Sequence, residues 1–294
     1  MAGKMTATRQ NRGAGARAAS RCTAILLVAA FIAVPPVHAW GPNGHRLAAG
    51  KAVETLPNEL RTWFEASRTF ISQHVTDPLE WRTKNLIAER RNQMIQLEKY
   101  GRFPFDNLPR NYKAALKKYS KATLDANGLL PWEIGLYSER LTNSMRSGKW
   151  DEARLNAAIL AFYVGESRDP FSTTDNFDGR MSGQIGVDSR FDLNLVDRFA
   201  LFIYIRPGDA QLISDPTDHA FEACLSSHGW VEPVLLADRR ARQGLPDYTD
   251  EYYARFYNNA GAILIRQLSD AATDVGSYWL TAWNNAGRPK PPAN

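Results

Sequence analysis

Apolar and polar side chains follow each other along most of the chain with the period of an α-helix. Apolar positions recur three or four residues apart, as at Ile134, Tyr137 and Leu141, which places them on one helix face. We find no run in which apolar and polar residues alternate one by one, the pattern typical of a half-buried strand. The pattern predicts eight helical segments, the last two of them broken into pieces: 46–55, 57–67, 109–121, 131–145, 151–165, 188–204, 217–243 and 251–283.

Between these segments the helical period is lost. We expect four stretches to be irregular: 70–80, 101–108, 124–130 and 169–186. The last is rich in Asp, Ser, Thr, Gly and Asn and is long enough to be a functional loop. Since no internal repeat or low-complexity linker follows Trp40, residues 40–294 are predicted to form one all-α domain.

The first 39 residues have the pattern of an export signal. Basic residues without any acidic residue precede an apolar run over 23–34, Pro35-Pro36 ends the run, and Val37-His38-Ala39 is a small-x-small cleavage pattern. The run has 12 residues, fewer than the roughly 20 that span a bilayer as a helix. We therefore expect a signal peptide over 1–39, cleavage before Trp40 and export to the periplasm or the cell exterior. The alternative is an uncleaved membrane anchor.

Composition and charge narrow the function classes. Aromatic residues make up 11% of the chain, which excludes disorder for most of it. The formal charge of +5 comes from 36 basic and 31 acidic residues, and five of the basic ones lie in 1–39, leaving 31 of each sign. A neutral domain does not attract polyanions as a whole, and the basic segments 113–121 and 239–242 are typical of solvated helix faces. We find no strong nucleic-acid or membrane signal, name no partner, and expect a monomer.

Cysteine and histidine counts limit the metal chemistry. Cys224 is the single cysteine after residue 39, so the domain can form neither an internal disulfide nor a multi-cysteine zinc site. Its apolar surroundings in the sequence predict a buried structural residue. Four histidines remain after residue 39. We expect His74 in a surface loop and His219 and His228 to be structural or exposed, which leaves His45 as the histidine of interest.

Several motifs carry a resemblance to one family. They are Trp40-Gly41 with Gly44-His45, the segments 77–82, 97–106, 130–132 and 163–165, the loop 173–184 and the tail 279–289. Over nearly all of residues 40–294, the chain resembles the zinc-dependent phospholipases C and the single-strand-specific nucleases of the P-one type. The resemblance implies a secreted all-α phosphodiesterase with three clustered zinc ions, in which the amine and carbonyl of the first mature residue, here Trp40, bind metal.

The zinc ligands that the resemblance implies are only partly retained. Their nine positions fall on Trp40, His45, Leu79, Gln93, Phe162, Glu166, Ser172, Asp188 and Asp192. Trp40, His45 and Asp192 match the family, and Glu166 keeps a carboxylate. At the degenerate positions, Phe162 and Leu79 have no lone pair to donate, while Gln93 and Ser172 are poor zinc ligands. The family needs five histidines, and four are present, so we expect the three-zinc cluster to be lost.

Three hypotheses remain. The first is a catalytically degenerate member of the family, with no metal or with one residual divalent ion, zinc included, at Trp40, His45 and Glu166. The second is a phosphodiester or phospholipid hydrolase that uses a reduced, oxygen-rich metal site. Asp188 and Asp192 lie four residues apart and can share a helix face beside Glu166, although a helix cap and a solvated first-turn acid are the simpler interpretation. The third is a non-enzymatic binding protein. No catalytic residue is assigned.

Overall fold

The fold was analysed in a computed structural model, which describes residues 40–292. The signal peptide predicted for 1–39 lies outside the described residues. The predicted all-α class is confirmed, because the described residues form helices and turns and no β-strand. Within the same range, no helix combines the length and the apolar character needed to cross a membrane.

The described part of the chain contains twelve α-helices. The α-helices are α1 (Pro42–Ala52), α2 (Asn58–His74), α3 (Asp77–Lys84), α4 (Leu86–Arg90), α5 (Tyr112–Lys118), α6 (Lys121–Asn127), α7 (Leu130–Arg146), α8 (Trp150–Ser167), α9 (Leu195–Arg198), α10 (Pro216–His228), α11 (Val231–Arg242) and α12 (Asp250–Asn285). The 3-10 turns are Val53–Thr55, Arg91–Gln93, Leu97–Tyr100, Pro170–Thr173 and Ala200–Phe202, and Ser189–Asn194 is a π-helical turn.

The helix α12 is longer than the sequence pattern predicts. Segment 251–283 was expected to be broken, yet it lies within one helix of 36 residues. The Thr249 side chain caps its start by accepting the N–H of Tyr252, and no proline interrupts it. Segment 217–243 is broken as predicted, between α10 and α11 at Gly229-Trp230.

Two segments expected to be irregular are helical. In 70–80, α2 continues to His74 and α3 starts at Asp77 with proline in its first turn, a position where the missing N–H costs nothing. In 124–130, α6 extends to Asn127 because Ser120 caps its start and Gly128 ends it with a φ of 100°. Conversely, the helix predicted over 188–204 is divided into the π-helical turn, α9 and a 3-10 turn.

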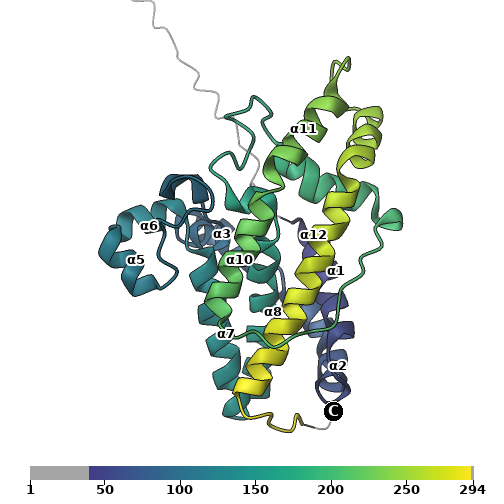
Figure 1. Cartoon of the computed structure of the whole chain (residues 1–294). Coiled ribbons are helices and arrows are strands. Elements are labelled where there is room, and N and C mark those ends of the chain that lie inside the picture. The colour runs from purple at the N-terminus through teal and green to yellow at the C-terminus, as the bar shows by residue number, and fades with distance from the viewer. Residues whose placement is uncertain (1–39, 293–294) are drawn as a thin grey trace, which may run out of the picture. The chain divides into compact units, whose positions relative to one another are not determined.

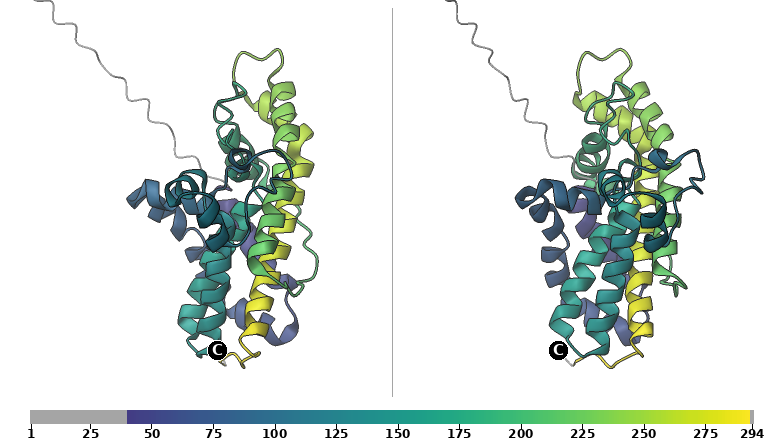
Figure 2. Two further views of the ribbon diagram at one scale, coloured as in Figure 1. Left: turned by 60° about the vertical axis from the view of Figure 1, so that its left-hand side comes forward. Right: turned by 90° about the vertical axis from the view of Figure 1, so that its left-hand side faces the viewer.

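The helices α7, α8 and α12 pack together at the centre of a bundle (Figure 1). The short turn 147–149 joins α7 to α8, so that these two run antiparallel. Trp279 of α12 ties the bundle together: its ring stacks on that of Phe64 of α2 at 4.2 Å, and its Nε1–H donates to the Ala157 carbonyl of α8 at 3.1 Å. Figure 1 shows α5 and α6 projecting to one side of this bundle, and Figure 2 shows the bundle from two further directions.

An extended segment, residues 203–213, runs along α12 without forming a strand (Figure 1). We call it the strap. Four of its backbone N–H groups donate to hydroxyl groups of α12 at 2.9 to 3.0 Å. The acceptors are spaced four residues apart and therefore share one helix face: Ser269, Thr273, Ser277 and Thr281.

Thr281→Val is expected to lower the free energy of unfolding by about 1–3 kcal/mol, because the buried N–H of Ile213 loses its acceptor. Thr273→Val is the matched control. Its partner, the N–H of Gly208, is exposed, so that water can replace the hydroxyl. Urea unfolding of both variants measures the difference, and an equal loss in both would contradict this role of burial.

Candidate functional site

Four buried carboxyl groups lie together where α8 ends and the π-helical turn begins. We call them the carboxyl cluster: Glu166, Asp169, Asp188 and Asp192. Each is at most 1% exposed. Glu166 lies in the last turn of α8, and Asp188 and Asp192 come from the π-helical turn and the residue before it. Burial raises the pKa of Asp192 most, and the charges of the other three raise it further, so these groups act on one another electrostatically.

Asp169 was not identified from the sequence. It caps the 3-10 turn that follows α8, where its Oδ1 accepts the N–H of Phe171 at 2.9 Å. Asp169 lies two residues after the end of α8, where helical spacing no longer applies, so the sequence pattern carries no signal for it. Its side chain is fully buried.

The helix α1 brings His45 and Trp40 to the cluster. The Nε2 of His45 lies 3.1 Å from Oε1 of Glu166, and the His45 ring stacks on Phe162 with centroids 4.3 Å apart. The indole Nε1–H of Trp40 donates to the carbonyl of Gly165 at 2.8 Å. Position 165 needs a glycine, because a Cβ on this residue would lie 2.9 Å from Nδ1 of His45. The close approach of α1 to α8 thus rests on Gly165.

The other residues at the implied ligand positions make contacts within the protein. The Ser172 hydroxyl donates to Oε2 of Glu166 at 2.8 Å. The side-chain amide of Gln93 donates to the Pro78 carbonyl at 3.1 Å and to a carboxylate oxygen of Glu89 at 3.2 Å. Leu79 packs in the apolar core. These residues therefore do not supply the donor set of a three-zinc centre.

Arg82, to which the sequence assigned no role, faces the cluster from α3. Burial lowers the pKa of its guanidinium group, while the charges of Glu166, Asp188 and Asp192 act in the opposite direction. Its Nη1 lies 3.5 Å from Oε1 of Gln93. The guanidinium thus places a positive charge beside the carboxyl groups on the side of Leu79 and Gln93, two of the replaced ligand positions.

Burial controls the protonation of the site. It raises the pKa of Glu166 to about 8 and that of Asp188 to about 7, and it raises the pKa values of Asp169 and Asp192 well above their usual range. It also lowers the pKa of His45 to about 3, so that this ring is neutral at neutral pH. Among the described residues, the following cluster oxygens have no hydrogen-bond partner: Asp169 Oδ2 and both oxygens of Asp188 and of Asp192.

The hollow beside the cluster is small. It measures about 30 Å³, roughly the volume that one water molecule takes in the liquid. Three apolar side chains, those of Met94, Phe171 and Phe177, line it together with the polar groups of the site. A phosphodiester substrate does not fit this hollow.

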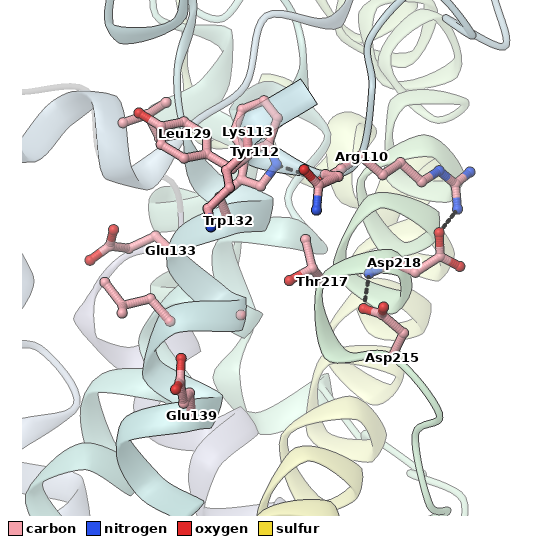
Figure 3. Close-up of a pocket in the computed structure, with 13 residues that line it drawn as sticks. Arg110, Tyr112, Lys113, Leu129, Trp132, Glu133, Glu139, Asp215, Thr217 and Asp218 are labelled. Carbon is pink, nitrogen blue, oxygen red and sulfur yellow. Dashed lines mark hydrogen bonds and ion pairs between the residues drawn. The ribbon is translucent and has the colours of Figure 1, made fainter. Parts of the chain in front are cut away.

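A larger pocket lies elsewhere, between α7, the start of α5 and the start of α10 (Figure 3). It measures about 650 Å³. The rings of Tyr112 and Trp132 lie 5.4 Å apart along it, and Arg110 pairs with Asp218 on the α10 side. None of the site residues expected from the sequence lines this pocket, so this pocket and the carboxyl cluster are separate.

Comparison with known proteins assigns no family to the chain. No family model and no curated protein matches it. Within the described residues, no three His, Cys, Asp or Glu side chains are grouped so that they could hold a metal ion. The resemblance to the phospholipase C and P-one nuclease family stays an expectation from the sequence motifs.

The remaining histidines and the cysteine lie outside the cluster. His74 ends α2 instead of lying in a loop, and its Nδ1 lies 2.8 Å from Oδ2 of Asp77. Nε2 of His219 lies 3.0 Å from Oδ1 of Asp274. Cys224 is fully buried, as predicted, and burial raises the pKa of its thiol to about 12, which rules out a thiolate nucleophile at neutral pH.

Proposed function

We propose that this protein is an exported, catalytically degenerate member of the family of zinc-dependent phospholipases C and P-one type nucleases. The motifs that begin at Trp40 support the family, and the pattern of residues 1–39 supports export. The observation that best supports the loss of metal-dependent catalysis concerns Glu166. Its two carboxyl oxygens are engaged by His45 and by the Ser172 hydroxyl, so a residue implied as a metal ligand is satisfied by protein groups.

Two further features support a site without catalytic activity. Phe162 stacks on His45 where the resemblance implies a zinc-binding histidine. The hollow of about 30 Å³ is far smaller than small-molecule sites, which typically have about 300–1,000 Å³. A phosphodiester that cannot reach the carboxyl cluster cannot be hydrolysed there.

Metal content and hydrolysis test this proposal. Protein is purified after native export, its N-terminus is confirmed as Trp40, and its metals are measured by mass spectrometry. We expect less than one zinc ion per chain and no hydrolysis of phosphatidylcholine, single-stranded DNA or a chromogenic phosphodiester. Two or three stoichiometric zinc ions together with hydrolysis would overturn the proposal. Should a substoichiometric metal be bound, His45→Ala removes it and His74→Ala, at the end of α2, leaves it.

A second candidate function is a hydrolase with an oxygen-rich divalent site. The observation in its favour is that both carboxyl oxygens of Asp188 and of Asp192 lack hydrogen-bond partners among the described residues. Hard cations such as Ca²⁺, Mg²⁺ and Mn²⁺ prefer such oxygens. Phosphodiester hydrolysis that appears on addition of Mn²⁺ or Ca²⁺ and is lost in Asp192→Ala would support this candidate over the first.

A further inference from the structure

The pocket between α5, α7 and α10 has the volume of a small-molecule site (Figure 3). It measures about 650 Å³, within the range of about 300–1,000 Å³ that is typical of such sites. The helix α7 forms one wall with Trp132, Leu136 and Glu139, which lie three or four residues apart and therefore share one helix face. The start of α10 forms another wall with Thr217 and Asp218. A compact molecule can therefore lie between the two helices.

The helices that border the pocket are held in place without it being filled. Gly135 of α7 lies so close to Thr217 of α10 that a Cβ would be 2.2 Å from the Thr217 hydroxyl oxygen. Asp215 and Asn111 cap α10 and α5, because the side-chain oxygen of each accepts an N–H of the first helical turn, at 2.9 and 3.0 Å. The pocket is therefore preformed, as small-molecule sites usually are.

Two aromatic rings line the pocket. The rings of Trp132 and Tyr112 lie 5.4 Å apart at an angle of 58°, and both side chains are half-buried. The Trp132 ring is fixed, because its Nε1–H donates to the Arg110 carbonyl at 2.6 Å and its edge meets the ring of Phe221 at 5.3 Å. Aromatic rings attract both flat apolar groups and cations. This part of the pocket suits a ligand that carries a flat body.

Acidic groups outnumber basic groups around the pocket. The lining includes two basic residues, Arg110 and Lys113, and four acidic ones, Glu133, Glu139, Asp215 and Asp218. The positive charge of Arg110 is already matched, since this guanidinium pairs with Asp218 and with Glu222 of α10. The balance of charge in the pocket therefore favours a cationic ligand.

Glu133 is a lining carboxylate without a partner. Among the described residues, no side chain donates a hydrogen bond to it. Burial raises the pKa of Glu133, and the charge of Glu89 acts in the same direction, whereas the charges of Arg140 and Arg91 lower it. Neither arginine lines the pocket, and Arg91 pairs with Asp125 at 2.9 Å. A cation inside the pocket would stabilise the ionised carboxylate at close range.

The pocket suits neither anions nor metal ions. A helix start such as that of α10 attracts anions, but Asp215 and Asp218 already place negative charge there. The lining carboxyl groups are also not gathered as metal ligands, since the described residues contain no group of three His, Cys, Asp or Glu that could hold a metal ion. An organic cation remains, and its N–H groups can donate to carboxylate oxygens.

We propose that this pocket binds a small organic cation in which an ammonium or amidinium group is attached to a flat apolar body. The body lies against the rings of Trp132 and Tyr112, and the charged N–H groups donate to the carboxylate of Glu133. Charge-assisted hydrogen bonds of this kind are about twice as strong as neutral ones. Binding there is independent of the proposed function, because none of the residues at the implied zinc-ligand positions lines the pocket.

Tryptamine and benzamidine test the proposal, because each joins a flat ring to a charged group with N–H donors. In calorimetric titrations of the purified protein, we expect both to bind with a Kd below about 1 mM. Tryptophol, which has a neutral hydroxyl in place of the ammonium group of tryptamine, should bind at least about tenfold more weakly. Absence of binding by both cations at about 1 mM, or equal affinity for tryptamine and tryptophol, would overturn the proposal.

Glu133→Gln should weaken tryptamine binding at least about tenfold and leave tryptophol binding unchanged, because the amide keeps the shape of the side chain and loses its charge. Glu59→Gln is the matched control, since Glu59 is exposed at the start of α2 and does not line the pocket. An equal loss of tryptamine affinity in both variants would show a general effect of charge and would contradict the role of Glu133.

A second readout covers the case in which Glu133→Gln does not fold. In NMR spectra of the unsubstituted protein with isotope-labelled tryptophan, tryptamine should shift the indole N–H signal of Trp132. Trp132→Phe identifies this signal by its loss. A titration that shifts the signals of other tryptophans and leaves that of Trp132 unchanged would place the ligand elsewhere and overturn the proposal.

Discussion

Raising the pH from about 5 to about 9 is expected to destabilise the metal-free chain by several kcal/mol. The unfolded chain releases the protons of Glu166 and Asp188 near their ordinary pKa values of 4.5 and 3.8, whereas the folded chain keeps them up to about 8 and 7. Between these values the folded state binds more protons, so stability falls as the pH rises. Each pKa unit corresponds to about 1.4 kcal/mol.

Urea unfolding across this pH range measures the effect. Glu166→Gln should flatten the profile, because the amide cannot ionise, while Glu139→Gln, at an exposed position of α7, should not change it. A profile that is flat from about pH 5 to about pH 9 would contradict the prediction. The charged or titratable groups around Glu166 and Asp188 are His45, Arg82, Glu89, Asp169, Asp178, Arg190 and Asp192.

Gly128→Ala is expected to lower the free energy of unfolding by about 3–5 kcal/mol. Gly128 ends α6 with a φ of 100°, a region that residues with a Cβ avoid. A Cβ would also lie 2.1 Å from the carbonyl oxygen of Met94 and 2.9 Å from Cα of Ile95. These backbone atoms cannot move away, because the N–H of Gln96 donates to the Asn127 carbonyl at 2.7 Å.

Gly148→Ala is the matched control for this prediction. Gly148 has a φ of 67°, and a Cβ there would meet no atom within 4 Å. Gly148→Ala should lower the free energy of unfolding by about 1–2 kcal/mol, the cost of the left-handed backbone alone. Thermal or urea unfolding of both variants separates the cost of the backbone conformation from the cost of the contact with Met94. Equal decreases in the free energy of unfolding would show that this contact adds nothing.

The sequence predicted the helices best where a long apolar stripe coincides with clear end signals. The helix α7 lies within one residue of the predicted 131–145 because Pro131 marks its first turn and the turn to α8 follows. Segment 70–80 was predicted to be irregular because its helical period is lost, yet only two residues separate α2 from α3 there, and the rest of the segment is helical. The unbroken course of α12 depends on packing along the whole bundle, which a local pattern does not contain.

The candidate site was predictable only in part. The spacing of Glu166, Asp188 and Asp192, together with the family motifs, selected three residues that the fold brings near one another. Asp169 and Arg82 were missed for the same physical reason: an acid or a base at a helix end is usually exposed, and only the tertiary packing of α3 and α8 buries these two. Sequence spacing alone cannot reveal that a guanidinium group faces a replaced ligand position.

The hydroxyl groups that hold the strap also donate to carbonyls of their own helix. Ser269, Thr273 and Ser277 each donate to the carbonyl four residues earlier, so α12 keeps its backbone bonds when the strap leaves. Ile205 and Ile213 are buried in the apolar core, but detachment of the part between them needs no unfolding of the bundle. In hydrogen-exchange measurements, the amides of Arg206, Gly208 and Gln211 should exchange through a local opening long before those of α12. The molecule would then contain two levels of stability, a middle part of the strap that detaches locally and a bundle that opens at a higher free energy.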